Sequence, residues 1–205
     1  AGVGGRGRGK APSKGWLGAA RFIRVAGGAG MIGTSGAWVL EQACQEVRRW
    51  DAAYPGRELR LGVNLSVRQL QRKHIVAEIR ALLRKTGFKP ERLTLEITES
   101  AVIREGEETS LVLQKLRAAG MKVAIDDFGT GYSSLSYLAR FSIDVLKIDK
   151  AFVKASGRGA KNSSLLRAIV GLGHSLAAEL VAQGIAHPQP ARISEPSACW
   201  GLGHY

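Results

Sequence analysis

The chain has 205 residues, of which 45% are hydrophobic and 23% are charged, a composition typical of a soluble globular domain with a sizeable core. It contains no apolar run of about 18 residues, which argues against a membrane span, and its first residues lack the hydrophobic segment of a signal peptide. Two cysteines, Cys44 and Cys199, leave one disulfide open as an alternative, but a reduced, cytoplasmic setting is the default expectation.

The net charge of +13 is distributed unevenly along the chain. Residues 1–40 hold six basic side chains and no acidic one, whereas residues 91–149 hold ten of the seventeen carboxylates. A basic surface favours anionic partners such as nucleotides, nucleic acid or anionic lipid. We expect residues 1–20 to be a solvated, disordered, glycine-rich segment and residues 21–205 to form the folded domain. Residues 4–10 nearly fit a phosphate-binding loop, but no strand precedes them and Ala11 supplies no hydroxyl for magnesium.

Helical and strand-like patterns alternate from residue 36 onward. We predict helices over 37–50, 75–86, 107–119 and 163–178, and strands over 60–66, 93–99, 122–127, 144–149 and 180–185. Gly87 and Pro90 mark the end of the helix over 75–86. This alternation predicts a parallel sheet with crossover helices.

The ends of the predicted strands favour one α/β architecture over another. Polar side chains gather at the carboxyl ends, and side chains two residues apart share a face, so Asn64, Glu96, Asp126 and Lys147 are expected to converge. Convergence at strand ends favours a TIM-like (β/α)₈ barrel, whose mouth holds the functional groups, over an open doubly wound sheet. We expect this barrel to be incomplete at its N-terminal strands, because residues 1–20 are poor strand formers.

The converging residues indicate a chemistry. Asn64, Glu96, Asp126 and Asp127 offer only oxygen ligands, which suit Mg²⁺ or Mn²⁺ better than zinc. Two such ions can activate a water and clamp a phosphoryl group, while Lys147 could stabilise charge on the phosphate or orient the water. The alternative is that each residue merely makes hydrogen bonds at a turn or helix cap.

Four segments carry a family resemblance. NLS at 64–66, LEITES at 95–100, DDFGTGYSSLSYL at 126–138 and LKID at 146–149 resemble the EAL family of bacterial second-messenger signalling. The resemblance implies a (β/α)₈-like barrel that hydrolyses cyclic di-GMP to linear pGpG with two magnesium or manganese ions. It also implies a role for each matching residue: metal ligands at Asn64, Glu96, Asp126 and Asp127, a lysine near the attacking water at Lys147, a metal-centre aspartate at Asp149, and at Glu99 the glutamate that holds the loop 128–134.

The sequence departs from the family's pattern at several positions. Residues 1–20, where the family's Glu-Ala-Leu strand would lie, contain no glutamate. Gln183 and Ala186 stand where the family's A-E-G-V-E segment has two glutamates, and Gly203 stands where a glutamine is expected. We therefore expect impaired hydrolysis, since the loss of metal-binding or catalytic groups typically lowers activity by orders of magnitude.

Other interpretations stay open. The domain could be a cyclic di-GMP receptor without turnover, or a structural or dimerising module. The resemblance makes a homodimer and attached sensor or cyclase domains in a longer parent protein conceivable. A zinc site formed by His187, Cys199 and His204 is a further alternative, but its spacing is irregular and a fourth ligand is missing.

Overall fold

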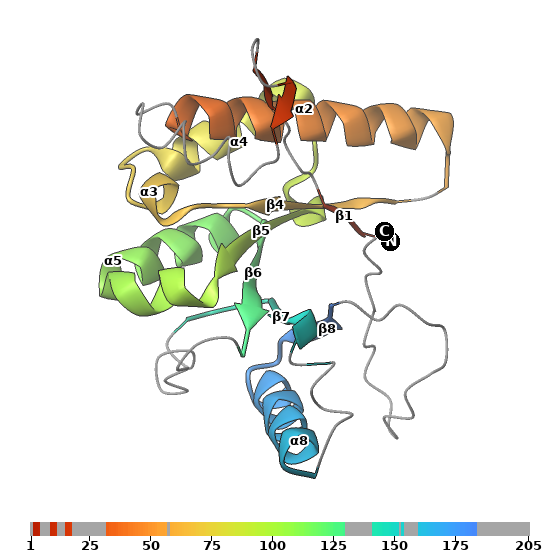
Figure 1. The fold of residues 1–205 in the computed structure, drawn as a ribbon. Coiled ribbons are helices and arrows are strands. Elements are labelled where there is room, and N and C mark those ends of the chain that lie inside the picture. The colour runs from red at the N-terminus through yellow and green to blue at the C-terminus, as the bar shows by residue number, and fades with distance from the viewer. Residues whose placement is uncertain are drawn as a thin grey trace. The chain divides into compact units, whose positions relative to one another are not determined.

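The computed structural model describes residues 2–4, 9–11, 15–17, 32–56, 58–129, 141–151, 153 and 160–183 (Figure 1). The chain divides into two compact units, Ala1–Leu95 with Lys115–Met121, and Glu96–Gln114 with Lys122–Tyr205. Several predictions made from the sequence fall outside the described residues: those for Ala186, Gly203, the loop residues 130–134 and the zinc candidates His187, Cys199 and His204. The predicted boundary at residue 20 stays a prediction.

The first unit contains short strands, helices and part of a longer strand. They are β1 (Gly2–Gly4), β2 (Gly9–Ala11), β3 (Gly15–Leu17), α2 (Ile32–Ala53), β4 (Arg60–Asn64), α3 (Val67–Leu70), α4 (Ile75–Thr86), the 3₁₀ turn η1 (Pro90–Arg92) and the first half of β5 (Leu93–Thr98). β1 pairs in parallel with β4, and β2 pairs with β3 in an antiparallel hairpin. In this unit the strand order is β1-β4-β5.

The segment 1–20 differs from the expectation of a poor strand former, because β1, β2 and β3 all lie within it. Pairing explains the difference. Val3 lies opposite Leu61 of β4, and Leu61 is buried, so the neighbouring strand supplies hydrogen bonds that override the low strand propensity of glycine.

The helix α4 begins and ends where its sequence predicts. Ile75, Ile79 and Leu83 are buried, and their spacing of four residues forms one apolar stripe. Gly87 adopts a left-handed conformation with φ of 63°, which glycine tolerates without steric cost. The Phe88 N–H then donates to the Leu83 carbonyl oxygen at 3.1 Å and the Gly87 N–H to that of Arg84 at 3.2 Å, the Schellman pattern that ends helices.

The second unit contains the rest of the parallel sheet. After β5 come α5 (Glu99–Ala118), β6 (Lys122–Phe128), β7 (Val145–Ile148), α8 (Ala160–Ser175) and β8 (Glu179–Ala182). In this unit the strand order is β5-β6-β7-β8, and β7 pairs in parallel with both β6 and β8. The parallel pairing confirms the predicted α/β organisation, while closure of the strands into a barrel stays a prediction.

The helix α5 begins earlier than predicted. It starts at Glu99, immediately after β5, and not at residue 107. No proline interrupts the intervening residues, and the carboxylate of Glu99 lies in the first turn, where negative charge is favourable. The direct strand-to-helix junction fixes Glu99 at the carboxyl end of β5.

Cys44 lies buried on α2 and forms no disulfide with any residue that the structure describes. Burial raises its pKa to about 11, although a hydrogen bond with Thr86 opposes this shift. A thiol with so high a pKa is almost entirely protonated at neutral pH and is a weak nucleophile. Cys199 lies outside the described residues, so a disulfide is not tested.

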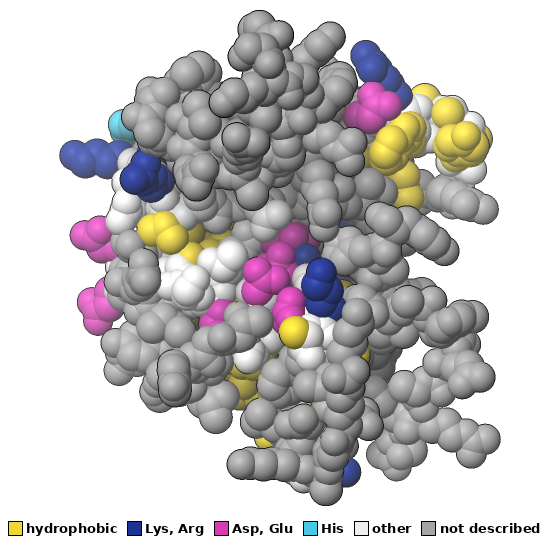
Figure 2. All heavy atoms as spheres, in the orientation of Figure 1, with side chains coloured by type: hydrophobic (Ala, Val, Ile, Leu, Met, Phe, Trp, Pro, Cys, Tyr) yellow, Lys and Arg dark blue, Asp and Glu magenta, His cyan; other side chains and the backbone are white. Residues whose placement is uncertain are grey.

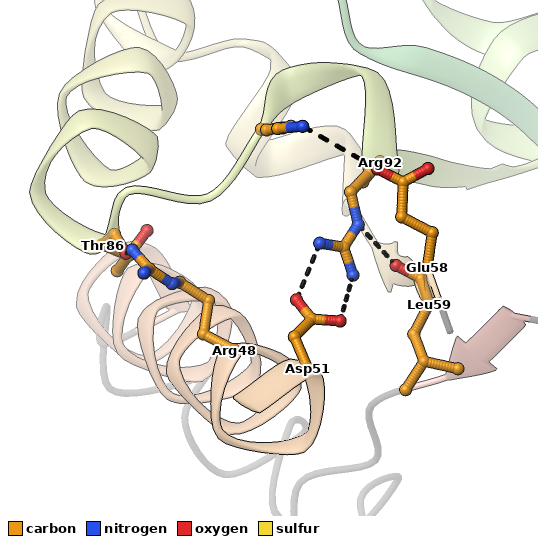
Figure 3. A network of polar contacts seen from close by, with 7 residues as sticks. Arg48, Asp51, Glu58, Leu59, Thr86 and Arg92 are labelled. Atoms are coloured by element: carbon orange, nitrogen blue, oxygen red, sulfur yellow. Dashed lines mark hydrogen bonds and ion pairs between the residues drawn. The ribbon is translucent and has the colours of Figure 1, made fainter. Parts of the chain in front are cut away.

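An ion pair joins α2 to the segment before β5 in the first unit (Figure 3). The two terminal nitrogens of Arg92 each donate to one oxygen of Asp51 at 2.7 Å. Arg92 Nε donates to the Leu59 carbonyl oxygen at 2.7 Å, and the guanidinium carbon lies 5.2 Å from the centre of the Phe88 ring. Arg48 donates in the same region to the carbonyl oxygen of Thr86 at 2.9 Å. A bidentate pair with these added contacts should stabilise the unit more than a simple surface ion pair.

Substituting Arg92→Met should therefore lower the free energy of unfolding by about 2–4 kcal/mol, because Asp51 keeps its charge and loses both hydrogen bonds. Urea unfolding followed by circular dichroism measures the change. Lys89→Met is the matched control, since its pair with Glu58 spans 3.8 Å between exposed side chains and should change the free energy by less than about 1 kcal/mol. Equal changes in the free energy of unfolding for the two substitutions would show that the Arg92–Asp51 pair does not stabilise the unit more than a surface ion pair.

The contribution of Asp51 to the stability of the fold should decrease at acidic pH. The hydrogen bond from Arg92 lowers the pKa of the Asp51 carboxyl group, so the ionised form is favoured in the folded chain. Its contribution to stability is complete above the unfolded-state value of about pH 4 and is lost as the pH falls through the lower folded-state value. The stability difference between the native chain and Arg92→Met should accordingly shrink below about pH 4.

Candidate functional site

Three of the predicted site residues meet within the second unit. Lys147 on β7 extends its ammonium group to Glu96 Oε2 on β5 at 2.7 Å and to Asp126 Oδ1 on β6 at 3.2 Å. The side chains of Lys147, Glu96 and Asp126 are 10%, 14% and 13% exposed, so these charges interact with limited screening by water. The structure thus brings together three of the four residues that were predicted to converge. Figure 2 shows acidic side chains in magenta beside basic side chains in dark blue, without labels for single residues.

The register of β6, β7 and β8 accounts for the part of this convergence that involves Asp126 and Lys147. Ala124, Val145 and Val181 form a buried apolar cluster, and Val145 lies opposite both Ala124 and Glu179 on its neighbouring strands. Asp126, Lys147 and Gln183 each follow one member of this cluster by two residues. Because side chains two apart share a strand face, a polar layer is expected directly beyond the apolar layer.

An irregularity in β6 changes the direction of the paired aspartates. Ile125 lies opposite Leu146 and Phe128 lies opposite Ile148, so three steps along β6 match two along β7. This is a β-bulge, and Asp127 within it has a positive φ of 55°. A regular strand would point Asp126 and Asp127 to opposite faces, whereas a bulge redirects a side chain and is common beside active sites.

Gln183 adds a contact that the sequence did not predict. Its side-chain Nε2 donates to Asp126 Oδ1 at 2.6 Å, and its backbone N–H donates to the Ile148 carbonyl oxygen at 3.0 Å. The residue is 7% exposed. The signal in the sequence was the spacing of two residues from Val181, which places Gln183 on the same face as the other polar groups.

Asp127 and Asp149 add negative charge near this cluster. Loss of solvating water and then the negative charges of Asp126 and Asp149 raise the pKa of the Asp127 carboxyl, while Lys147 and Lys150 oppose the shift. Asp149 Oδ1 accepts a hydrogen bond from the Ala151 N–H at 2.7 Å, as a helix-capping aspartate does. Asp149 thus has a structural contact, and its predicted place at a metal centre stays a prediction.

Asn64 belongs to the first unit, where it is the last residue of β4 and is exposed. Its position at a strand end agrees with the sequence. Its role as a metal ligand together with residues of the second unit stays a prediction.

Glu99 contacts the start of the loop that follows β6. Its Oε2 accepts a hydrogen bond from the Gly129 N–H at 3.0 Å, and the Glu99 residue is 3% exposed. Gly129 has a φ of 98°, a conformation that glycine adopts at little cost. A buried carboxylate that holds this backbone turn agrees with the predicted loop-stabilising role of Glu99.

The carboxylate oxygens of Glu96, Asp126 and Asp127 are suitable ligands for a hard divalent cation, but the structure does not group these side chains around one point. Carboxylate oxygens are the ligands that Mg²⁺ and Mn²⁺ prefer. Among the residues that the structure describes, however, no group of three or more His, Cys, Asp or Glu side chains is placed to hold a metal ion. Lys147 instead contacts the two closest carboxylates.

Comparisons with known proteins give one family. The model of the EAL domain matches residues 6–200. The chain is 41% identical to an uncharacterized signaling protein of Caulobacter vibrioides, over 97% of this chain and 24% of that protein. It is 37% identical to the cyclic di-GMP phosphodiesterase NbdA of Pseudomonas aeruginosa, over 92% of this chain and 24% of NbdA. The chain thus spans about a quarter of the length of these relatives.

A solved structure supports the same fold. The PaMucR phosphodiesterase in its c-di-GMP complex superposes with a TM-score of 0.78 at 35% identity, over 88% of this chain and 73% of that one. This similarity confirms the predicted α/β fold of the TIM-like EAL type. In the parts of the chain that the structure describes, none of the helices has the length and apolar character needed to span a membrane.

The contact between Glu99 and Gly129 can be tested by amide hydrogen exchange. Glu99→Leu removes the acceptor, and a hydrogen bond to a charged group contributes about 1.5–3 kcal/mol, so exchange of the Gly129 amide should become about 10–150-fold faster. Glu99→Gln is the control, because its side-chain carbonyl can still accept the bond. Unchanged exchange in Glu99→Leu would show that the carboxylate does not hold the loop.

Proposed function

The chain belongs to the EAL domain family, and on that premise we propose that it binds cyclic di-GMP and hydrolyses it to linear pGpG slowly. The observation that carries the proposal is the polar layer of Glu96, Asp126, Lys147 and Gln183 over a buried apolar layer. The similarity to a cyclic di-GMP phosphodiesterase and to a structure in complex with c-di-GMP supports the choice of ligand.

Lys147 is proposed to hold the phosphate. Its ammonium group is the cationic member of this polar layer, and cyclic di-GMP carries negative charge on its phosphodiesters. A lysine whose surroundings are largely dry forms stronger interactions with an anion than an exposed lysine does. Binding would require the ammonium to exchange part of its contact with Glu96 or Asp126 for contact with a phosphate oxygen.

Hydrolysis needs more than phosphate binding. One P–O bond breaks, a water oxygen bonds to phosphorus, and a proton moves from that water to the departing sugar oxygen. A carboxylate can relay this proton, but Glu96 and Asp126 are both engaged with Lys147, and the Gln183 amide is not a base. Divalent ions supply charge neutralisation in the family. In the second unit Glu96, Asp126 and Asp127 would hold them, but Lys147 already contacts Glu96 and Asp126.

A receptor function is the second candidate, and Gln183 favours it. A neutral amide donates to Asp126 at a position where the family carries a glutamate. An amide preserves the polar layer and the shape of the site but supplies neither negative charge nor a proton acceptor. Binding would then be retained while turnover is lost.

Calorimetric titration with cyclic di-GMP in calcium and in magnesium, followed by chromatography of the products, tests the proposal. We expect saturable binding in both, and pGpG production lower by orders of magnitude than in a relative with glutamates at the positions of Gln183 and Ala186. Lys147→Met should weaken binding by about tenfold or more, since it removes a charge-assisted contact.

Lys122→Met is the matched control. It removes the same charge in the same unit. Lys122 lies at the start of β6, away from Asp126 near the end of that strand, and pairs with Glu179 at 3.8 Å. The dissociation constant for cyclic di-GMP should therefore stay within about twofold of the native value. Absence of binding would contradict the proposed ligand. Rapid conversion to pGpG in magnesium would contradict the proposed slow turnover and would show that the chain is a fully active phosphodiesterase.

A further inference from the structure

Gln183 makes a contact that bears on the ionic requirements of the site. It follows β8 directly, and its backbone N–H donates to Ile148 of the neighbouring strand at 3.0 Å. The residue is buried. Because Val181 lies opposite Lys147 in the β7–β8 pairing, Gln183 lies one strand repeat further along the same face. The backbone hydrogen bond and the burial of Gln183 therefore hold its side-chain amide in place next to Asp126.

The amide contacts Asp126 at an oxygen that has other donors. Asp126 Oδ1 accepts hydrogen bonds from Gln183 Nε2 at 2.6 Å and from the Asp127 N–H at 3.1 Å, and it lies 3.2 Å from Lys147 Nζ. Three donors on one oxygen define the rotation of the carboxylate. These three protein donors are enough to orient the Asp126 carboxylate.

The charges of the four side chains show what the amide changes. Two carboxylates, Glu96 and Asp126, face one ammonium, and the neutral Gln183 leaves one uncompensated negative charge. A glutamate in place of Gln183 would bring a third carboxylate within hydrogen-bonding distance of Asp126. Such a carboxylate pair is unfavourable unless a proton or a cation lies between the two groups. A glutamate at this position would therefore need a divalent cation between itself and Asp126, whereas the glutamine does not.

We propose that Gln183 is a positioning residue that orients Asp126 without a divalent cation, so that this site takes up cyclic di-GMP in the absence of added metal. The proposal rests on the proposed function for the identity of the ligand. It goes further by assigning the cation requirement of binding to one residue. Substitution of Gln183→Glu should convert cation-independent binding into cation-dependent binding.

The first test is titration of the 205-residue chain with cyclic di-GMP in EDTA and in Mn²⁺. The native chain should bind with dissociation constants within about threefold of each other, because its carboxylates are already held by protein donors. Gln183→Glu should bind at least about tenfold more weakly in EDTA and should recover in Mn²⁺. Gln183→Leu, which keeps bulk but donates no hydrogen bond, should bind more weakly in both.

The second test uses Mn²⁺ alone, read by electron paramagnetic resonance without nucleotide. Gln183→Glu should bind Mn²⁺ at least about tenfold more tightly than the native chain, because a third carboxylate completes an oxygen ligand set. Gln114→Glu is the matched control, since it makes the same chemical change at an exposed position of α5 and should leave Mn²⁺ affinity unchanged. A residue that only supported the fold would alter thermal stability without changing the response to Mn²⁺.

The outcomes separate this inference from the proposed function. Loss of native binding in EDTA with recovery in Mn²⁺ would overturn the inference and leave the proposed ligand in place. Absence of nucleotide binding in either condition would overturn the proposed ligand, and with it the cation-free uptake inferred here. Equal Mn²⁺ affinities of the native chain and Gln183→Glu would overturn the role of Gln183 in the cation requirement.

Discussion

The contact of one lysine with two carboxylates is the interaction on which the polar site depends. Glu96 and Asp126 come from different strands, and their side chains are mostly withdrawn from water. Two uncompensated carboxylates in such surroundings would repel each other and lose favourable solvation. Lys147 compensates one of these two negative charges with a cation attached to the chain, and Gln183 supplies a neutral donor to Asp126. The site is therefore largely satisfied by its own side chains.

The strand register of the sheet brings Asp126, Lys147 and Gln183 close to one another. An apolar layer of Ala124, Val145 and Val181 lies one strand repeat before the polar layer, so hydrophobic burial and functional chemistry are stacked along the same strands. The bulge at Asp126 and Asp127 then breaks the regular alternation of side chains along β6. The candidate site thus lies at the carboxyl ends of the strands, where barrel architectures hold their functional groups.

Much of this arrangement could be predicted from the sequence, and the remainder has identifiable physical causes. The helix over 75–86 was predictable because its apolar stripe and Gly87 act locally. The convergence of Glu96, Asp126 and Lys147 was predictable from strand periodicity. The bulge was not, because periodicity assumes a regular backbone. Strand β1 was missed because its pairing partner, and not its glycine-rich composition, stabilises it. The loss of a charge at Gln183 is visible in the sequence, but its hydrogen bond to Asp126 was not predictable, because the two residues are 57 positions apart and only the fold brings them together.

The contact between Lys147 and Glu96 at 2.7 Å should stabilise the folded chain, and a double-mutant cycle tests this most directly. The free energy of unfolding in EDTA would be measured for the native chain, Glu96→Gln, Lys147→Met and the double variant. We expect a favourable coupling energy of about 1–3 kcal/mol between Glu96 and Lys147, against less than about 1 kcal/mol for the Lys122–Glu179 pair at 3.8 Å. A coupling energy indistinguishable from zero between Glu96 and Lys147 would contradict the account.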